Sequence, residues 1–345
     1  MNKNYFILLL LSIFFISCKQ PSENPAKTNG KINSISVIID DLLWNAEIGD
    51  SIRNKFASPV IGLPQEEPLF TINQYPMKLM EGYMTDCRNI IVIKKDAKEA
   101  FKIEKNKIAS PQNVFYISGK AAGDILCLIQ KHSAEIIKTI HQTEVEEFQR
   151  INRKSLLSPK FFKDSLNIAI EIPSNYELML QKKNFFWFKK EIISGNTSIL
   201  IYEVPISSIE TKRDKISQII QMRDSIGKLY IHGKELNTDM ITEEAYSPYF
   251  SNTVLNYKKT YETKGTWELK NDFMSGPFIN YAIVDKENNR VLVLEGFCYS
   301  PSKEKRDLML ELEAIIKSVK IDKKTAPKES SKIMAMVSRK LNLGN

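Results

Sequence analysis

Histidine and cysteine are scarce in this sequence, and their scarcity limits the chemistry that the chain can perform. The 345 residues include three histidines and four cysteines. Nucleophilic hydrolysis needs a serine or cysteine beside a base that a third group orients, but no GxSxG motif is present. His132 and His141 lie about 2.5 turns apart on one expected helix, so they face different sides. We therefore expect these two residues and His232 to be surface histidines.

The cysteines form neither a metal site nor a disulfide framework. No two of them are spaced as CxxC, and no set of side chains offers the three or four ligands that zinc needs. The sequence therefore predicts no metal site and no cofactor. With Cys18 reserved for lipid, as argued next, Cys87, Cys127 and Cys298 can form at most one disulfide. Buried free thiols are the favoured interpretation.

Long apolar runs are also absent, except for one at the start of the chain. Phe6–Ile16 is apolar apart from one serine, but eleven helical residues rise only about 16 Å, and a bilayer core of about 30 Å needs roughly twenty. The run therefore predicts a signal peptide over residues 1–17. Residues 15–18, which end in Ser17 and Cys18, resemble the lipobox of bacterial lipoproteins. This resemblance implies cleavage before Cys18, diacylglycerol on its sulfur and a further acyl chain, for which we expect palmitate, on its amine.

The residues after Cys18 concern the location of the protein. Two or three acyl chains make attachment to a membrane nearly permanent. In the Bacteroidota an acidic cluster directly after the lipidated cysteine resembles a surface-export signal, and here Lys19 and Gln20 stand in its place. We expect a lipid-anchored protein of the bacterial cell envelope that faces the periplasm. Residues 18–33 are polar and contain two prolines, so they are expected to form a flexible tether.

Composition predicts a folded protein without a nucleic-acid partner. Hydrophobic residues make up 43% and charged residues 26% of the chain, which is typical of a globular protein. The formal net charge of +8 would suggest nucleic acid in a cytosolic protein, but we expect export, and the paired lysines are scattered. Residues 322–345 form a basic tail, which we expect to be disordered. An amphipathic helix on the membrane, built on Ile333–Val337, is the alternative.

Hydrophobic periodicity predicts an α+β fold, with antiparallel sheets backed by helices in two segments of similar size. These segments are 34–157 and 158–321, with the boundary at Ser158. Strands are expected at 35–39, 89–93, 114–118, 166–170, 185–191, 198–204, 253–261, 266–269, 278–285 and 290–296, and helices at 43–56, 121–153, 212–226 and 302–318.

Two pairs of carboxylates are the strongest indication of an enzyme. Asp40 and Asp41 end a strand, and Glu66 and Glu67 lie between prolines in a turn. Glycosidases place two carboxyl groups about 5–9.5 Å apart across the scissile bond, and a turn folded over the strand end would allow this distance. The alternative is that these acids are solvated or cap helices, and it is the one we favour.

An aromatic cluster, Phe185–Phe188, is the main candidate for binding. In a strand, Phe186 and Phe188 share one face, whereas Phe185 and Trp187 share the other. Both faces must therefore be covered. A central buried strand is the favoured interpretation, and a groove for a glycan or peptide is the alternative.

Several short phrases together resemble one family. They are Trp44 with 49–53, then 62–70, 88–90, 186–191, 265–267, 276–278 and 295–297. The chain resembles the Bacteroidota lipoprotein family catalogued as domain of unknown function 4837. The resemblance covers nearly all of the chain after Cys18, and it implies an envelope lipoprotein but no activity. The second segment, 158–321, also resembles the PsbP and Mog1-like α/β/α fold, which is an analogy of fold alone.

The sequence thus favours an envelope lipoprotein of unknown molecular activity, acting as a non-enzymatic binding or assembly module. Its expected partners are the membrane, through Cys18, and an envelope protein or glycan. The alternative is an envelope glycan hydrolase that uses Asp40, Asp41, Glu66 or Glu67.

Overall fold

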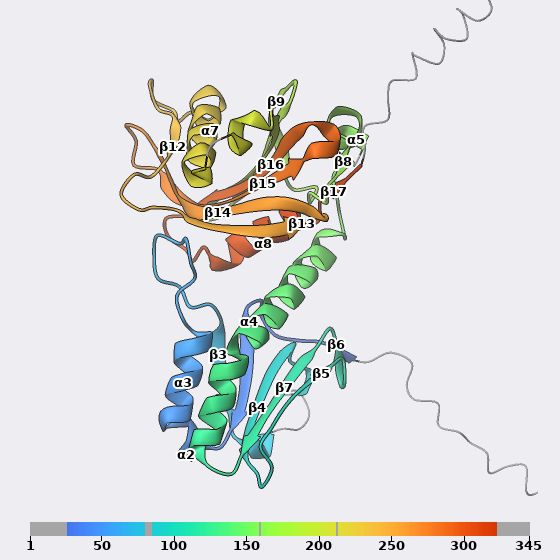
Figure 1. The fold of residues 1–345 in the computed structure, drawn as a ribbon, viewed down its shortest axis with the longest axis vertical. Helices are drawn as coiled ribbons and strands as arrows, with labels where there is room; N and C mark the ends of the chain where they lie inside the picture. Colours follow the sequence, from blue (N-terminus) through green and yellow to red (C-terminus); the bar gives the residue numbers. More distant parts are fainter. Residues whose placement is uncertain (1–25, 80–84, 159, 212, 323–345) are drawn as a thin grey trace, which may run out of the picture. The chain divides into compact units, whose positions relative to one another are not determined.

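The computed structural model describes residues 26–79, 85–158, 160–211 and 213–322. The expected signal peptide, Cys18 and the tail from residue 323 lie outside these ranges. The chain forms two compact units (Figure 1). Unit 1 comprises residues up to Asp50 together with Ile72–His132, and unit 2 comprises Ser51–Thr71 together with the chain from Ser133 onward. The units and the two segments expected to meet at Ser158 therefore divide the chain differently.

Unit 1 is built on a five-stranded sheet with the order β3-β2-β4-β7-β5. Its strands are β2 (Ser34–Ile39), β3 (Thr71–Tyr75), β4 (Asn89–Lys95), β5 (Ala100–Lys105) and β7 (Asn113–Gly119). The strands β2, β4 and β7 pair parallel, and β5 pairs antiparallel with β7. The parallel strands are almost continuously apolar because both of their faces are buried. The sheet is therefore mixed, within a fold whose α+β class is confirmed.

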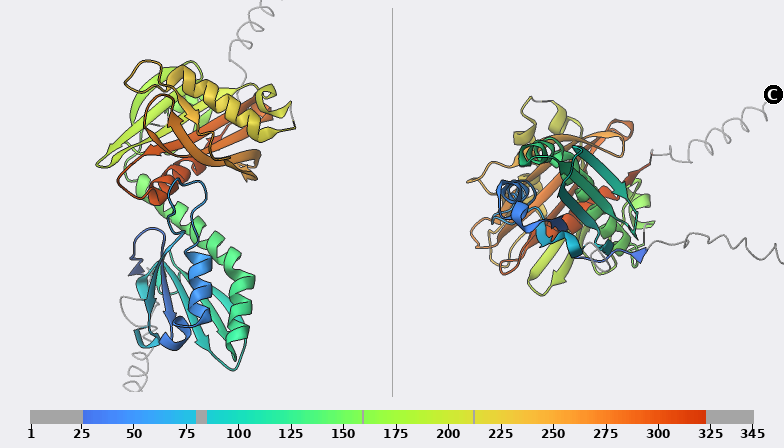
Figure 2. Two further views of the ribbon diagram at one scale, coloured as in Figure 1. Left: turned by 90° about the vertical axis from the view of Figure 1, so that its left-hand side faces the viewer. Right: turned by 90° about the horizontal axis from the view of Figure 1, so that it is seen from below.

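The helices of this region are α2 (Asp41–Trp44), α3 (Glu47–Phe56) and α4 (Ala122–Asn152), with a short 3₁₀ turn, η2 (Met77–Leu79). Figures 1 and 2 show the start of α4 against one face of the sheet. The single helix expected at 43–56 is divided in two. Asn45 ends α2, and the chain then turns so closely that a Cβ on Gly49 would lie 1.8 Å from the carbonyl oxygen of Trp44.

The described part of the expected tether is already bonded to unit 1. A short strand, β1 (Ala26–Lys27), pairs parallel with β6 (Ala109–Ser110). The guanidinium of Arg88 donates to the carbonyl oxygens of Gly30 and Lys31. The folded region therefore begins before Ser34.

Unit 2 is built on an antiparallel sheet with the order β12-β14-β15-β16-β11-β10-β9, and β13 also pairs with β14. Its strands are β9 (Glu177–Lys182), β10 (Phe185–Ile192), β11 (Gly195–Val204), β12 (Met240–Thr242), β13 (Tyr249–Leu255), β14 (Lys258–Leu269), β15 (Ser275–Asp285) and β16 (Arg290–Tyr299). A short 3₁₀ turn, η4 (Lys286–Asn288), closes the β15–β16 hairpin. A separate two-stranded ladder joins β8 (Ile168–Ala169) to β17 (Lys320–Ile321).

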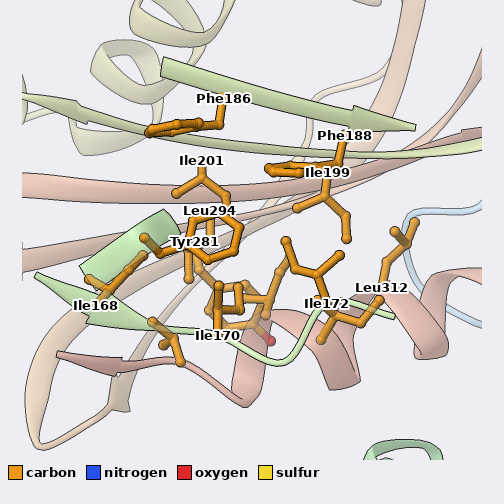
Figure 3. Packing of buried hydrophobic residues seen from close by; sticks show 14 of the residues in the cluster. Ile168, Ile170, Ile172, Phe186, Phe188, Ile199, Ile201, Tyr281, Leu294 and Leu312 are labelled. Atoms are coloured by element: carbon orange, nitrogen blue, oxygen red, sulfur yellow. The ribbon is translucent and has the colours of Figure 1, made fainter. Parts of the chain in front are cut away.

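Helices cover both faces of this sheet, which gives two hydrophobic cores (Figure 1). The helices of unit 2 include α5 (Lys160–Leu166), α6 (Ser207–Glu210), α7 (Lys215–Tyr230) and α8 (Arg306–Lys317). One core joins Leu312 and Ile315 of α8 to Ile201 and Leu294 of the sheet (Figure 3). The other core lies beneath α6 and α7. Apolar residues alternate between the two faces of each strand, so both faces need a cover.

The single strand expected at 253–261 is a hairpin formed by β13 and β14. Its two turn residues, Asn256 and Tyr257, both have positive φ, at 54° and 59°. A two-residue turn with this geometry needs positive φ at both central positions and usually contains Asn-Gly. Tyrosine in place of glycine hid the turn from sequence analysis.

Candidate functional site

Unit 2 contains a pocket of about 360 Å³, a size suited to a small ligand. We call it the loop pocket, because one of its walls is the proline-bracketed loop between α3 and β3. Its lining consists of Pro59, Val60, Ile61, Gly62, Leu63, Pro64, Gln65, Glu66, Tyr246, Ser247, Tyr249, Gly265 and Thr266. Two of the sequence phrases noted above, 62–70 and 265–267, therefore meet here although about 200 residues separate them.

Backbone hydrogen bonds close the base of the loop. Pro59 lies opposite Pro68 in an antiparallel bridge. The amide of Val60 donates to the carbonyl oxygen of Glu67 at 2.9 Å, and the amide of Leu69 donates to that of Ser58 at 2.8 Å. The loop is thus held as a hairpin-like unit, and the pocket wall extends from its base at Pro59 to its tip.

Glu67 fixes the loop to helix α8. Its side chain is 5% exposed, and its carboxylate accepts the backbone N–H of Lys305 at 2.8 and 2.9 Å and that of Arg306 at 2.7 Å. These N–H groups open α8, whose N-cap residue, Lys305, supplies no side-chain cap. Glu67 therefore caps α8 although it precedes Lys305 by 238 residues in the sequence. Its negative charge also lies at the positive end of the helix dipole.

Further contacts fix the orientation of the loop. The ammonium of Lys305 donates to Oε1 of Gln65 at 3.0 Å, and the guanidinium of Arg306 donates to the carbonyl oxygen of Pro68 at 2.8 Å. Gly62 has φ of +87°, and a Cβ at this position would lie 2.9 Å from the Cβ of Lys264. Glycine is therefore required there both for the turn and for close approach to β14.

The second wall is the segment 246–249, which leads into β13. Tyr249 pairs with Lys264 across the β13–β14 ladder. Pro248 is buried, and a Cβ on Gly265 would lie 3.1 Å from its ring. The absence of a side chain at Gly265 thus lets Pro248 lie directly on β14. This contact fixes the segment that carries Tyr246 and Tyr249, both of which line the pocket.

Exposed aromatic rings dominate the mouth of the pocket. Tyr246 is 70% exposed and Tyr249 is 59% exposed, although large aromatic side chains are usually well covered. Glu66 is also exposed, and it is the one charged residue among those that line the pocket. The pocket therefore combines aromatic faces, hydroxyl groups and a single carboxylate.

The four candidate carboxylates have different environments. Asp40 caps α2 by accepting the N–H of Leu42 at 2.9 Å, and exposed Asp41 accepts the amide of Gln74 at 2.9 Å. Both belong to unit 1, whereas Glu66 and Glu67 belong to unit 2. Within unit 2, Glu67 is buried under its two backbone donors, and Glu66 lines the pocket. The paired acids of the sequence thus separate into one structural residue and one pocket residue.

The aromatic cluster of β10 belongs mainly to the two cores. Phe186 and Phe188 lie in the core of α8, where Figure 3 shows both rings on the same side of β10. Phe185 lies in the other core and stacks on Tyr230, with ring centroids 4.3 Å apart. Trp187 is half-buried and donates its indole N–H to Ser198 at 3.1 Å. These positions agree with a buried strand, although Phe188 also lines a pocket of about 260 Å³ together with Phe162 and Tyr176.

Sequence analysis missed a polar cluster on the α8 side of the sheet, which we call the Glu313 cluster. Its members, drawn from α4, β14, β15 and α8, are His141, Glu262, Lys264, Tyr281, Glu313 and Lys317. Oε1 of Glu313 lies 3.0 Å from Nε2 of His141, 3.2 Å from the hydroxyl of Tyr281 and 2.5 Å from the ammonium of Lys317. The same Tyr281 hydroxyl donates to Glu262 at 2.5 Å.

The surroundings of Glu313 favour its ionised form. Burial alone would raise the pKa of Glu313, but the hydrogen bond from His141 and the charges of Lys264 and Lys317 outweigh burial and hold that pKa well below its ordinary value. Burial raises the pKa of Tyr281 well above its usual value. His141, expected to be an ordinary surface histidine, is half-buried against this carboxylate.

A buried ion pair lies on the opposite face, beneath α7. Arg223 and Glu295 are 1% and 0% exposed, and Nε of Arg223 donates to Glu295 at 2.8 Å. The guanidinium also lies over the ring of Phe278 and donates to Thr242. Burial raises the pKa of Glu295, although Arg223 and Asn280 oppose this effect. The pair joins helix α7 to the centre of the sheet.

Cysteines, metals and membrane spans add no further site. Cys87, Cys127 and Cys298 are free; Cys298 alone is buried, and Cys127 is exposed. Burial raises the pKa of the Cys298 thiol to about 12. Within the described ranges, no three His, Cys, Asp or Glu side chains are grouped as metal ligands. The helices in the same ranges include none that is both long and apolar enough to cross a membrane.

Two family models match the chain. Residues 155–318 match a domain of unknown function (DUF4837), and residues 28–153 match a second domain of unknown function (DUF8532). The resemblance to the first family is thus confirmed for the second half of the chain, whereas phrases such as 62–70 lie within the second model. No curated protein matches the chain.

Solved structures offer only distant likeness. The chain is similar to cyanobacterial PsbP (CyanoP) from Synechocystis, with 8% identity, 46% of this chain and 88% of that chain covered, and a TM-score of 0.32. The chain is 12% identical to LpqN, involved in cell envelope biogenesis of Mycobacterium tuberculosis; the match covers 44% of this chain and 82% of that chain, with a TM-score of 0.27. The chain is 8% identical to the Ran-binding protein Mog1p of Saccharomyces cerevisiae; the match covers 45% of this chain and 90% of that chain, with a TM-score of 0.29.

The family matches divide the loop pocket between them. Its loop, 59–66, lies within the region 28–153, and its other wall, 246–266, lies within the region 155–318. Both walls nevertheless belong to unit 2. Residues 155–318 alone would therefore lack one wall of the pocket and the cap of α8.

Proposed function

We propose that this protein is a lipid-anchored binding module of the bacterial cell envelope, and that the loop pocket is its ligand site. The anchor rests on the sequence around Cys18. The observation that carries the binding site is the built-in rigidity of the pocket wall, which a buried carboxylate fixes to a helix terminus. A wall ordered before binding lowers the entropic cost of association.

The environments of the acids favour binding over hydrolysis. A glycosidase needs two carboxyl groups that face each other across the substrate. Asp40 and Glu67 instead cap helices, and the pocket is lined by Glu66 as its one acid. A single carboxylate suits recognition of a ligand by hydrogen bonding.

The anchor is tested by metabolic labelling with an alkyne analogue of palmitate. Wild type should take up label and sediment with membranes, whereas Cys18→Ala should do neither. Equal labelling of both forms would contradict lipidation at Cys18. Protease treatment of intact cells then tests orientation, because a periplasm-facing protein should resist digestion until the outer membrane is opened.

The ligand site is tested by retention on a purified envelope fraction. The Cys18→Ala form removes the contribution of the anchor, and Tyr246→Ala with Tyr249→Ala removes the aromatic mouth. The double variant should lose most of its retention. The matched control, Tyr257→Ala, alters a tyrosine that is 101% exposed on the β13–β14 turn and should retain binding. Equal retention of all three forms would contradict the site.

A further inference from the structure

The lining of the loop pocket limits the charge of its ligand. Glu66 is the one charged side chain among the lining residues, and it is exposed to solvent. Among the lining residues a polyanion would meet this carboxylate and no lysine or arginine, and the nearby ammonium of Lys305 is already bonded to Gln65. The lining therefore disfavours a ligand that carries negative charge.

The aromatic mouth favours a ligand with an apolar face and polar edges. Tyr246 and Tyr249 each present more than half of their surface to solvent. Aromatic faces carry the negative part of the ring quadrupole, which attracts weakly positive C–H groups. A pyranose ring presents such C–H groups on its faces and hydroxyl groups around its edge.

The polar groups separate a sugar from a proline-rich peptide, the other ligand that aromatic grooves bind. An ionised carboxylate is an acceptor only, so Glu66 can form a hydrogen bond only with a ligand group that donates. Prolines have no N–H and offer carbonyl acceptors alone. Sugar hydroxyls both donate to a carboxylate and accept from groups such as the Ser247 hydroxyl, which also lines the pocket.

We infer that the loop pocket binds a neutral sugar ring of a glycan, stacked on Tyr246 or Tyr249 and donating a hydroxyl to Glu66. This inference rests on the proposed function and names its ligand class. The loop, fixed by Glu67, carries Glu66 in one wall of the pocket, and the tyrosines belong to the other, so the sugar binds to a site that is formed before it arrives.

The test uses the full chain with Cys18→Ala and four defined probes: tetra-N-acetylchitotetraose, maltotetraose, tetragalacturonic acid and a proline decapeptide. Binding is measured by saturation-transfer NMR and by titration of tyrosine fluorescence. At least one neutral oligosaccharide should bind. Tyr246→Ala or Tyr249→Ala should weaken it about 3- to 10-fold, Tyr249→Phe should retain it, and Glu66→Gln should weaken it about threefold. Tyr257→Ala is the control and should bind as wild type does.

Each other outcome overturns the inference. Binding of the decapeptide alone, lost in Tyr249→Ala, would refute the sugar but leave the binding module intact. Preferential binding of tetragalacturonic acid would refute the neutral ligand. If no oligosaccharide binds, while envelope retention still depends on Tyr246 and Tyr249, only the ligand class is wrong. If retention is also indifferent to these tyrosines, the proposed function fails as well.

Discussion

Replacing Glu67 tests the structural basis of the loop pocket. In Glu67→Ala, the N–H groups of Lys305 and Arg306 lose a charged acceptor in a buried place. Hydrogen bonds to charged groups contribute about 1.5–3 kcal/mol each, so loss of both predicts a decrease of roughly 3–6 kcal/mol in the free energy of unfolding of unit 2. Glu67→Gln keeps one acceptor without its charge and should fall between Glu67→Ala and wild type.

The assay is urea denaturation followed by tryptophan fluorescence. A Trp44→Phe background leaves Trp187 and Trp267, both of which belong to unit 2. Glu66→Ala is the matched control, because the neighbouring acid is exposed and should change stability by no more than about 0.5 kcal/mol. If Glu67→Ala were as stable as Glu66→Ala, the assignment of Glu67 as the cap of α8 would be refuted.

Three further predictions concern glycine and buried charge. Gly62→Ala should lower the free energy of unfolding by about 1–2 kcal/mol because Gly62 has a positive φ. The control, Gly123→Ala, lies in an open helical position and should leave stability unchanged or raise it. Equal thermal midpoints for the two variants would contradict this prediction. Arg223→Met should lower the free energy of unfolding in urea by about 3–5 kcal/mol because it leaves buried Glu295 without its ion-pair partner. Adding Glu295→Leu should restore most of the lost stability. A loss below about 1 kcal/mol in Arg223→Met would refute the contribution of this ion pair. The lowered pKa of Glu313 makes its stabilisation complete above the unfolded-state pKa of about 4.3 and lost as the pH falls through the lower folded-state value. The stability gap between wild type and Glu313→Gln should therefore narrow from pH 7 toward pH 3, and a constant gap would contradict the linkage.

Much of the fold could be predicted because it depends on local patterns. The short apolar runs of β10 and β11 and the long apolar stripe of α4 are properties of short windows of sequence. The parallel pairing of β2, β4 and β7 was not predicted, because antiparallel sheets were expected, although nearly continuous apolar runs are typical of parallel strands. Short or exposed elements left little signal: β9 lies at a sheet edge with mostly exposed residues, and its sequence shows no alternation.

The site was predictable only in part because it depends on contacts between distant residues. Sequence analysis selected the Glu66–Glu67 pair, but the partner that separates their roles begins at Lys305, 238 residues later. No local feature distinguishes the acid that caps a helix from the acid that lines a pocket. The Glu313 cluster is similar, because His141 and Glu313 are 172 residues apart. Tyr246 was missed because one exposed tyrosine in a loop has no periodic signature.

The most direct test of the central claim is a hydrogen–deuterium exchange footprint of the full chain with and without a purified envelope fraction. Binding should slow exchange in the peptides covering 59–66 and 246–249, and Tyr246→Ala with Tyr249→Ala should abolish this protection. Protection confined to other elements, such as β9 or α7, or an unchanged footprint in the double variant, would contradict the assignment of the loop pocket as the ligand site.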